Sequence, residues 1–248
     1  MCSSAAQPQT KAVRPQGRAD LRAAKRSADE RSEAEAPKKQ QHKTTAMIER
    51  DFWLLIDAVK QAAGDDQQKY VALLEKLLEA MTSDSIRRHA VYLMQLLQQS
   101  STEEVWAAHY LINGGYEEWG FEDFRYWLVA QGKQFFYDCL ANPAEFLCEQ
   151  VNIEEGDNPE LSFYEFWSAF KTAYERKSQR NLCHTYDWLS EYEKVQQAEF
   201  SLEEKMRPLA QEYKLRKRYP ALFQKFFQNF YYRLQKYQEQ QSPSTEPA

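Results

Sequence analysis

Residues 105 to 132 decide the fold, and they read VWAAHYLINGGYEEWGFEDFRYWLVAQG. Apolar residues recur at helical spacing on both sides of a central double glycine, which is able to close a helix because glycine tolerates the left-handed conformation. We therefore predict two helices that are neighbours in space, joined by a short connection. The residues that we expect to build or close this pair are Trp106, Tyr110, Gly114, Gly115, Gly120, Phe121, Phe124, Trp127 and Gly132.

Helical periodicity also extends on either side of this pair. Two helices are expected over residues 48–63 and 67–81, with a break at Gly64, and a third is expected to start at the cap cluster that begins with Thr82. Asn142 followed by Pro143 is typical of a helix start. Residues 181–200 are less regular.

Three further helix starts are predicted from one pattern, a serine followed three residues later by a glutamate. In such a capping box each side chain bonds the main-chain amide of the other residue. The three pairs are Ser101 with Glu104, Ser162 with Glu165, and Ser201 with Glu204.

The fold class that follows is all-α, because sustained alternation of apolar and polar residues is absent from the sequence. We expect a compact bundle of several orthogonal or antiparallel helices, with a disordered N-terminal tail. A long amphipathic helix is expected near the C-terminus, within residues 209–240.

Four regions are predicted along the chain. Residues 1–46 carry ten basic and five acidic residues without an apolar face, so they form either a disordered basic tail or an extension upstream of a start at Met47. Residues 47–180 form the main helical domain, residues 181–240 a helical extension packed on it, and residues 241–248 a disordered end.

The main domain resembles the bacterial domain-of-unknown-function family 4240. The resemblance covers roughly residues 48 to 180, and its longest match lies between Ala107 and Gly132. The family usually has acidic residues directly before the glycine and phenylalanine that correspond to Gly120 and Phe121, whereas Trp119 stands there in this chain. The resemblance implies a helical cytoplasmic domain and assigns no activity.

Composition excludes several classes of protein. The sequence has no apolar run of about eighteen residues and no apolar core of a secretory signal, so we expect a cytoplasmic protein outside the membrane. Its four cysteines and four histidines lack metal-site spacing, so neither a metal nor another cofactor is expected.

An enzymatic hypothesis is built on Glu118, Asp123, Arg125 and His109. Carboxylates beside a histidine can transfer protons in a hydrolase or transferase if they share a cleft. The same groups can equally form exposed ion pairs. Motifs for phosphate binding or for a catalytic nucleophile are absent from the sequence, so we rank an enzyme below a binding module.

The leading hypothesis is a module that binds a protein partner through the acidic connection near residues 116–123. Trp119 is either a packing lid or an anchor for the partner, because aromatic side chains dominate interface hot spots. The expected binding residues are Tyr116, Glu117, Glu118, Trp119 and Arg125.

Nucleic-acid binding by residues 209–240 is a second alternative, ranked lower. This stretch interleaves basic residues with phenylalanines and tyrosines, as in surfaces that stack bases and neutralise phosphates. The aromatic residues keep a helical period, however, which favours a core-facing role for them.

Overall fold

A computed structural model of the protein describes residues 45–113, 120–152, 161–207 and 212–227. The chain divides into two units, Met1–Met47 and Ile48–Ala248, and the elements described below are those of the second unit. All regular structure in the described ranges is helical, which confirms the predicted all-α class.

The first helical stretch ends at residue 63. The helices that follow are α2 (Gln67–Glu79), α3 (Ser83–Gln99), α4 (Glu103–Ile112), α5 (Gly120–Ala130), α6 (Lys133–Ala141), α7 (Pro143–Gln150), α8 (Tyr164–Ser178), the 3-10 turn η1 (Leu182–His184), α9 (Tyr186–Met206), α10 (Glu212–Arg218), α11 (Pro220–Leu222) and the π-helical turn η2 (Phe223–Phe227).

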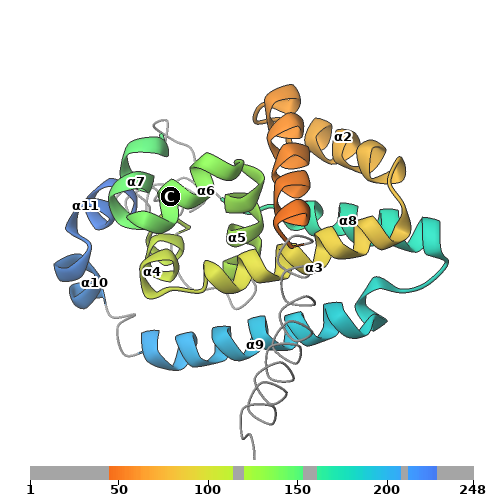
Figure 1. The fold of residues 1–248 in the computed structure, drawn as a ribbon. Helices are drawn as coiled ribbons and strands as arrows, with labels where there is room; N and C mark the ends of the chain where they lie inside the picture. Colours follow the sequence, from red (N-terminus) through yellow and green to blue (C-terminus); the bar gives the residue numbers. More distant parts are fainter. Residues whose placement is uncertain (1–44, 114–119, 153–160, 208–211, 228–248) are drawn as a thin grey trace, which may run out of the picture. The chain divides into compact units, whose positions relative to one another are not determined.

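Helix α3 is the central element of the packing. It packs against α8, α9 and α5, while α2 packs mainly on α8, and α7 packs on α4, α6 and α11 (Figure 1). An ion pair between Arg87 and Asp187 joins the N-terminal parts of α3 and α9. Farther along, Arg125 of α5 contacts both Leu97 of α3 and Glu199 of α9, so α3 and α9 run in the same direction.

Aromatic rings fill much of the core. The ring of Phe52 is completely buried and lies 5.3 Å from the ring of Trp53, 5.2 Å from Tyr92 and 6.1 Å from Phe170. Each such ring buries a large apolar area, and edge-to-face pairs add to that stabilisation. The aromatic rings that we expected to build the α4–α5 pair are buried or half-buried: Trp106, Tyr110, Phe121, Phe124 and Trp127.

Several predicted helix boundaries are confirmed. The hydroxyl of Thr82 accepts the N–H of Ser85 at 3.1 Å and so caps α3. Gly64 follows the first helical stretch with φ 66°, in the left-handed region that glycine adopts readily. Pro143 is the first residue of α7, where its missing N–H costs nothing.

The start of α4 differs from the predicted capping box. Thr102 caps this helix, because its hydroxyl accepts the N–H of Val105 at 3.3 Å. The hydroxyl of Ser101 donates to the main-chain oxygen of Leu97 at 2.9 Å instead. Ser101 also accepts a hydrogen bond from Arg125, so tertiary contacts take the serine away from the helix start.

The other two predicted capping boxes were also wrong. Helix α8 begins after Phe163, which is buried and whose N–H donates to the main-chain oxygen of Asp123, so a contact with α5 fixes this start. Ser201 lies inside α9, which continues to Met206. Three of the four buried residues of α9, Trp188, Val195 and Leu202, stand seven positions apart, and this wide spacing explains why the sequence shows no evident helical period there.

The C-terminal helix expected over residues 209–240 is interrupted in the part that the structure describes. Helix α10 ends at Arg218, and Tyr219 has non-helical angles of φ −130° and ψ 62°. Pro220 explains the interruption, because the proline ring disfavours the α conformation of the residue before it. The proline then starts α11.

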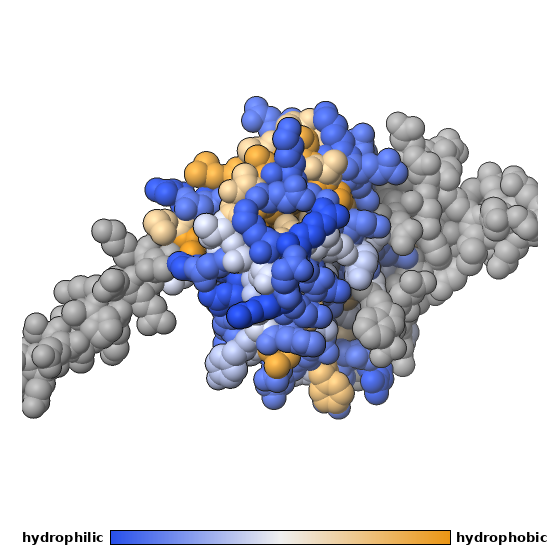
Figure 2. Space-filling view, turned by 90° about the vertical axis from the view of Figure 1, so that its right-hand side faces the viewer, coloured by the Kyte–Doolittle hydropathy of each residue, from blue (hydrophilic) through white to orange (hydrophobic). Residues whose placement is uncertain are grey.

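No helix in the described ranges combines the length and the apolar character that crossing a bilayer requires. The face drawn in Figure 2 is mostly hydrophilic, with apolar side chains gathered in its upper part.

We predict that Gly132→Ala destabilises the domain by about 2–3 kcal/mol, because Gly132 has φ 103° in a region that is nearly exclusive to glycine. A Cβ atom there would also lie 2.6 Å from a carboxylate oxygen of Asp57, which accepts the N–H of Lys133 at the start of α6.

Urea-induced unfolding measures the change in the free energy of unfolding. Gly64→Ala is the control, because a Cβ at Gly64 meets no atom within 4 Å, and about 1 kcal/mol is expected from its left-handed φ alone. Equal losses in the two variants would contradict the close contact at Gly132.

Candidate functional site

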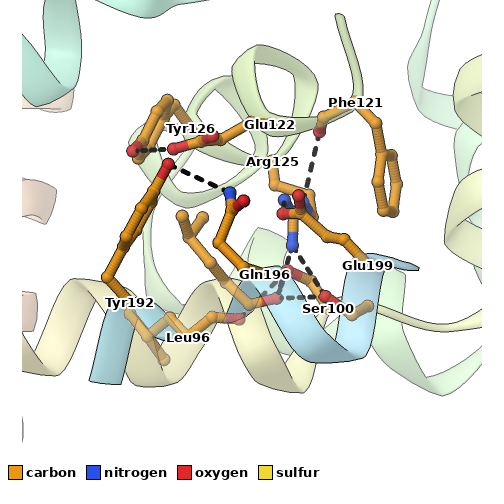
Figure 3. Close-up of polar contacts among 11 residues, drawn as sticks. Leu96, Ser100, Phe121, Glu122, Arg125, Tyr126, Tyr192, Gln196 and Glu199 are labelled. Atoms are coloured by element: carbon orange, nitrogen blue, oxygen red, sulfur yellow. Dashed lines mark hydrogen bonds and ion pairs between the residues drawn. The ribbon is translucent and has the colours of Figure 1, made fainter. Parts of the chain in front are cut away.

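Arg125 is the centre of the polar contacts that join α3, α5 and α9 (Figure 3). Its side chain is completely buried, although sequence analysis had expected it to bind a partner or to take part in catalysis. The guanidinium donates to the main-chain oxygen of Leu97 at 2.9 Å and to the hydroxyl of Ser101 at 2.7 Å. It also donates to the main-chain oxygen of Phe121 at 3.2 Å and forms an ion pair with Glu199.

The guanidinium keeps its charge in this position. Burial lowers the pKa of Arg125 to about 10, which still leaves the group protonated at neutral pH. The carbon of the guanidinium lies 4.4 Å from the ring centre of Phe121, close enough for a cation–π contact. An arginine held by four oxygen acceptors and a ring serves as an internal brace between helices.

Two further polar contacts lie beside the brace. The hydroxyl of Tyr126 donates to the carboxylate of Glu122 at 2.5 Å, and the amide of Gln196 donates to the hydroxyl of Tyr192 at 3.0 Å (Figure 3). Burial, and then the neighbouring Glu122, raises the pKa of Tyr126, so its hydroxyl remains a donor. Glu122 therefore has a partner on its own helix.

His109 is enclosed by aromatic rings at the end of α4. Its side chain is 1% exposed, and its ring lies 5.6 Å from the ring of Phe121 and 5.4 Å from that of Phe124. The Nδ1 atom lies 3.1 Å from the side-chain nitrogen of Asn113, so it accepts a hydrogen bond and Nε2 carries the proton. Burial, and then the charge of Arg125, lowers the pKa of His109 to about 3.

The enzymatic hypothesis named four residues, and the structure brings two of them together. His109 and Arg125 both contact the ring of Phe121, but both are buried there. Asp123 is half-buried, and Glu118 lies outside the described residues. Within the described ranges, the structure gathers no group of three or more histidine, cysteine, aspartate or glutamate side chains that could hold a metal ion.

Glu199 is the member of this network that sequence reasoning missed. It stands 74 residues from Arg125 and lies on α9, in a stretch that the sequence pattern left irregular. Local pattern carries no signal for such a pair. The one hint is the burial of Arg125 itself, because Glu122 on the same helix accepts a hydrogen bond from Tyr126 and the buried charge needs a further acidic partner; that hint becomes visible only in the structure.

Most of the predicted binding residues fall in a segment that the structure does not describe: Tyr116, Glu117, Glu118 and Trp119, together with Gly114 and Gly115. The residues on both sides of that segment are described. Asn113 precedes it and pairs with Leu161, whose N–H and main-chain oxygen bond the Asn113 side chain at 3.1 and 3.3 Å. Phe121 follows it and is held by Arg125.

Most aromatic residues that the structure describes in the C-terminal stretch face the core, although Tyr213 of α10 is 67% exposed. Phe223, Phe226 and Phe227 are all buried. Arg218 forms ion pairs with Glu103 and Glu104 of α4. These rings are therefore covered by protein, whereas stacking on bases needs exposed ring faces.

We predict that His109 makes the domain less stable as the pH falls from about 6.5. The folded protein holds His109 neutral with a pKa of about 3, whereas the unfolded chain takes up the proton near 6.5, so acid favours unfolding. The expected loss between pH 7 and pH 5 is about 2 kcal/mol, from about 1.4 kcal/mol per pKa unit.

The measurement compares urea-induced unfolding of the wild type and His109→Gln at pH 7 and pH 5. The variant should lack that part of the pH dependence, and His89, whose pKa burial also lowers, is present in both proteins. His184→Gln, at an exposed position, is the matched control. Identical pH dependence in the wild type and His109→Gln would contradict a neutral buried imidazole.

Comparison with known proteins adds one finding. The model of a family described as "Protein of unknown function (DUF4240)" matches residues 47–176, slightly more than half of the 248 residues. No curated protein matches the chain, and no solved structure does so either. The chain with the buried Arg125 brace thus belongs to the DUF4240 family, whose function is unknown.

Proposed function

We propose that the domain is a binding module that engages a protein partner through the acidic segment of residues 116–123, at the connection between α4 and α5. The observation that carries the proposal is how firmly both ends of this connection are held. Asn113 bonds both main-chain groups of Leu161, and Arg125 bonds the main-chain oxygen of Phe121. Binding residues are often found in connections that a rigid scaffold positions.

The negative charge of the chain favours a partner with a basic surface. The whole chain has a formal net charge of −5, and the basic excess of residues 1–46 leaves the remainder more acidic still. Four acidic residues lie within the segment and its continuation into α5: Glu117, Glu118, Glu122 and Asp123. Opposite charge steers association and suppresses wrong partners, and it does so less as salt increases.

The side-chain contacts in the structure give less support to the two alternatives, an enzyme and a nucleic-acid-binding protein. Arg125 and His109, which the enzymatic hypothesis needs, are enclosed in the brace and in the ring cluster. The described phenylalanines of the C-terminal stretch, which base stacking needs, are buried. The proposal also keeps the cytoplasm as the compartment, where the free thiols of Cys139, Cys148 and Cys183 would stay reduced.

The test is photo-crosslinking of the full chain in its native host, with a photoreactive phenylalanine in place of Tyr116. We expect a discrete crosslinked protein, and Trp119→Ala should lower its yield at least tenfold, because an aromatic anchor contributes about 2 kcal/mol or more to an interface. Tyr186→Ala is the matched control, since Tyr186 is 86% exposed on α9 and should leave the yield unchanged. Equal yields from the wild type and Trp119→Ala for every crosslinked protein would refute the anchor.

A further inference from the structure

The outward side of α9 carries three exposed apolar side chains. Helix α9 packs along α3 (Figure 1), and on its outer side Tyr186 is 86% exposed, Leu189 42% and Phe200 63%. At about 100° per residue around the helix axis, the three residues lie within about 60° of one another. Apolar side chains that share one helix face, instead of being scattered, are typical of a contact surface.

Two glutamates stand on the same face of α9. Glu193 and Glu204 fall within the same arc of about 60° as the three apolar residues. Both are exposed, and neither has a hydrogen-bond or ion-pair partner among the described residues. We name the five residues Tyr186, Leu189, Glu193, Phe200 and Glu204 the α9 stripe.

The other acidic residues of α9 all have a basic partner within the protein. The pairs are Asp187 with Arg87, Glu191 with Lys194, Glu199 with Arg125, and Glu203 with Arg207. The unpaired carboxylates of α9 are therefore those on the α9 stripe. The stripe presents apolar side chains together with two negative charges that the described part of the protein leaves uncompensated.

The shape of the α9 stripe suits a second helix. Helix α9 is regular from Tyr186 to Met206, so the stripe is about 27 Å long at about 1.5 Å per residue. Its residues, with Gln197 in the middle, follow one another at steps of three and four. A ridge with that spacing interdigitates with the side chains of a helix that lies alongside it.

We propose that the α9 stripe binds an amphipathic helix of a partner protein, with lysine or arginine residues beside the apolar face of that helix. The apolar side chains of the partner pack on Tyr186, Leu189 and Phe200. Its basic side chains pair with Glu193 and Glu204, and their long apolar stems cover the surface between the rings.

Charge complementarity selects this ligand over the other candidates. Nucleic acids and anionic lipids would bring further negative charge against the two carboxylates. A second copy of the chain would bring the same two carboxylates, and its own α9 stripe offers no cation to pair with them. A basic helix supplies both the apolar contacts and the opposite charge.

The α9 stripe goes beyond the proposed function, because it predicts a second ligand that does not depend on the acidic segment. Tyr186→Ala should therefore weaken binding at the stripe and leave the crosslink from residue 116 unchanged.

The experiment titrates the full chain into a fluorescent, capped peptide of about three heptads and follows the anisotropy of the peptide. The peptide has leucine at positions a and d, lysine at e and g, and alanine elsewhere, so that its lysines oppose self-pairing. We expect saturable binding with a dissociation constant on the order of 10 μM. A peptide with glutamate in place of each lysine should not bind, and equal binding of the two peptides would overturn the proposal.

Phe200→Gln tests the apolar contact. It should raise the dissociation constant of the lysine peptide about tenfold, because the burial of a phenylalanine ring is lost. Leu54→Gln is the matched control, since Leu54 is 62% exposed on the first helical stretch, and it should leave the affinity unchanged. Leu189→Gln is the second stripe variant if circular dichroism shows that Phe200→Gln is unfolded. Wild-type affinity in a folded stripe variant would refute the contact.

The double variant Glu193→Gln and Glu204→Gln tests the charge. It should weaken binding at least about fivefold at low salt, and the difference from the wild type should vanish near about 1 M salt, because salt screens exposed charges. Glu149→Gln together with Glu165→Gln is the matched control, which removes the same charge from exposed positions on α7 and α8. Equal losses in the two double variants would mean that only total charge matters, against the proposal.

Sedimentation of the full chain without peptide examines the other occupant. We expect the wild type and Phe200→Gln to sediment alike. Self-association that Phe200→Gln abolishes would place a second copy on the α9 stripe and overturn the assignment to a basic helix.

Discussion

The structure depends on the burial of one positive charge. The guanidinium of Arg125 is removed from water, and a buried charge is tolerated only when oxygens and an opposite charge replace the lost hydration. Those groups come from the end of α3, from Ser101, from α5 itself and from Glu199 of α9. Because the cost of leaving the charge unpaired is several kcal/mol, the three helices have little freedom to shift relative to one another.

This constraint reaches the proposed binding segment. Arg125 holds the main-chain oxygen of Phe121, where the acidic segment enters α5. Two residues later the main-chain oxygen of Asp123 accepts the N–H of Phe163, the residue before α8. One helix, α5, thus positions both the end of the acidic segment and the start of α8.

Sequence could predict the parts of the fold that rest on local chemistry. Helical spacing gave the inward-facing rings, and the Thr82 cap, the Gly64 break and the Pro143 start each follow from one residue type at one position. Pro220 indicates the break at Tyr219, whereas the helical spacing of the phenylalanines around it favours one continuous helix, and the proline effect prevails.

Features that depend on distant residues could not be predicted. The ion pair joins Arg125 to Glu199, 74 residues away, and the enclosure of His109 depends on rings from the neighbouring helix, so no local pattern encodes either feature.

The most direct test of the account is solvent exchange of the Arg125 side-chain Nε–H, followed by NMR after transfer into D₂O. We predict that this hydrogen, bonded to the main-chain oxygen of Phe121 inside the core, exchanges as slowly as the backbone amides of α5. The exposed guanidinium of Arg176 is the internal reference for fast exchange. Exchange of Arg125 at the rate of Arg176 would show that its charge is hydrated, and the brace between α3, α5 and α9 would not exist.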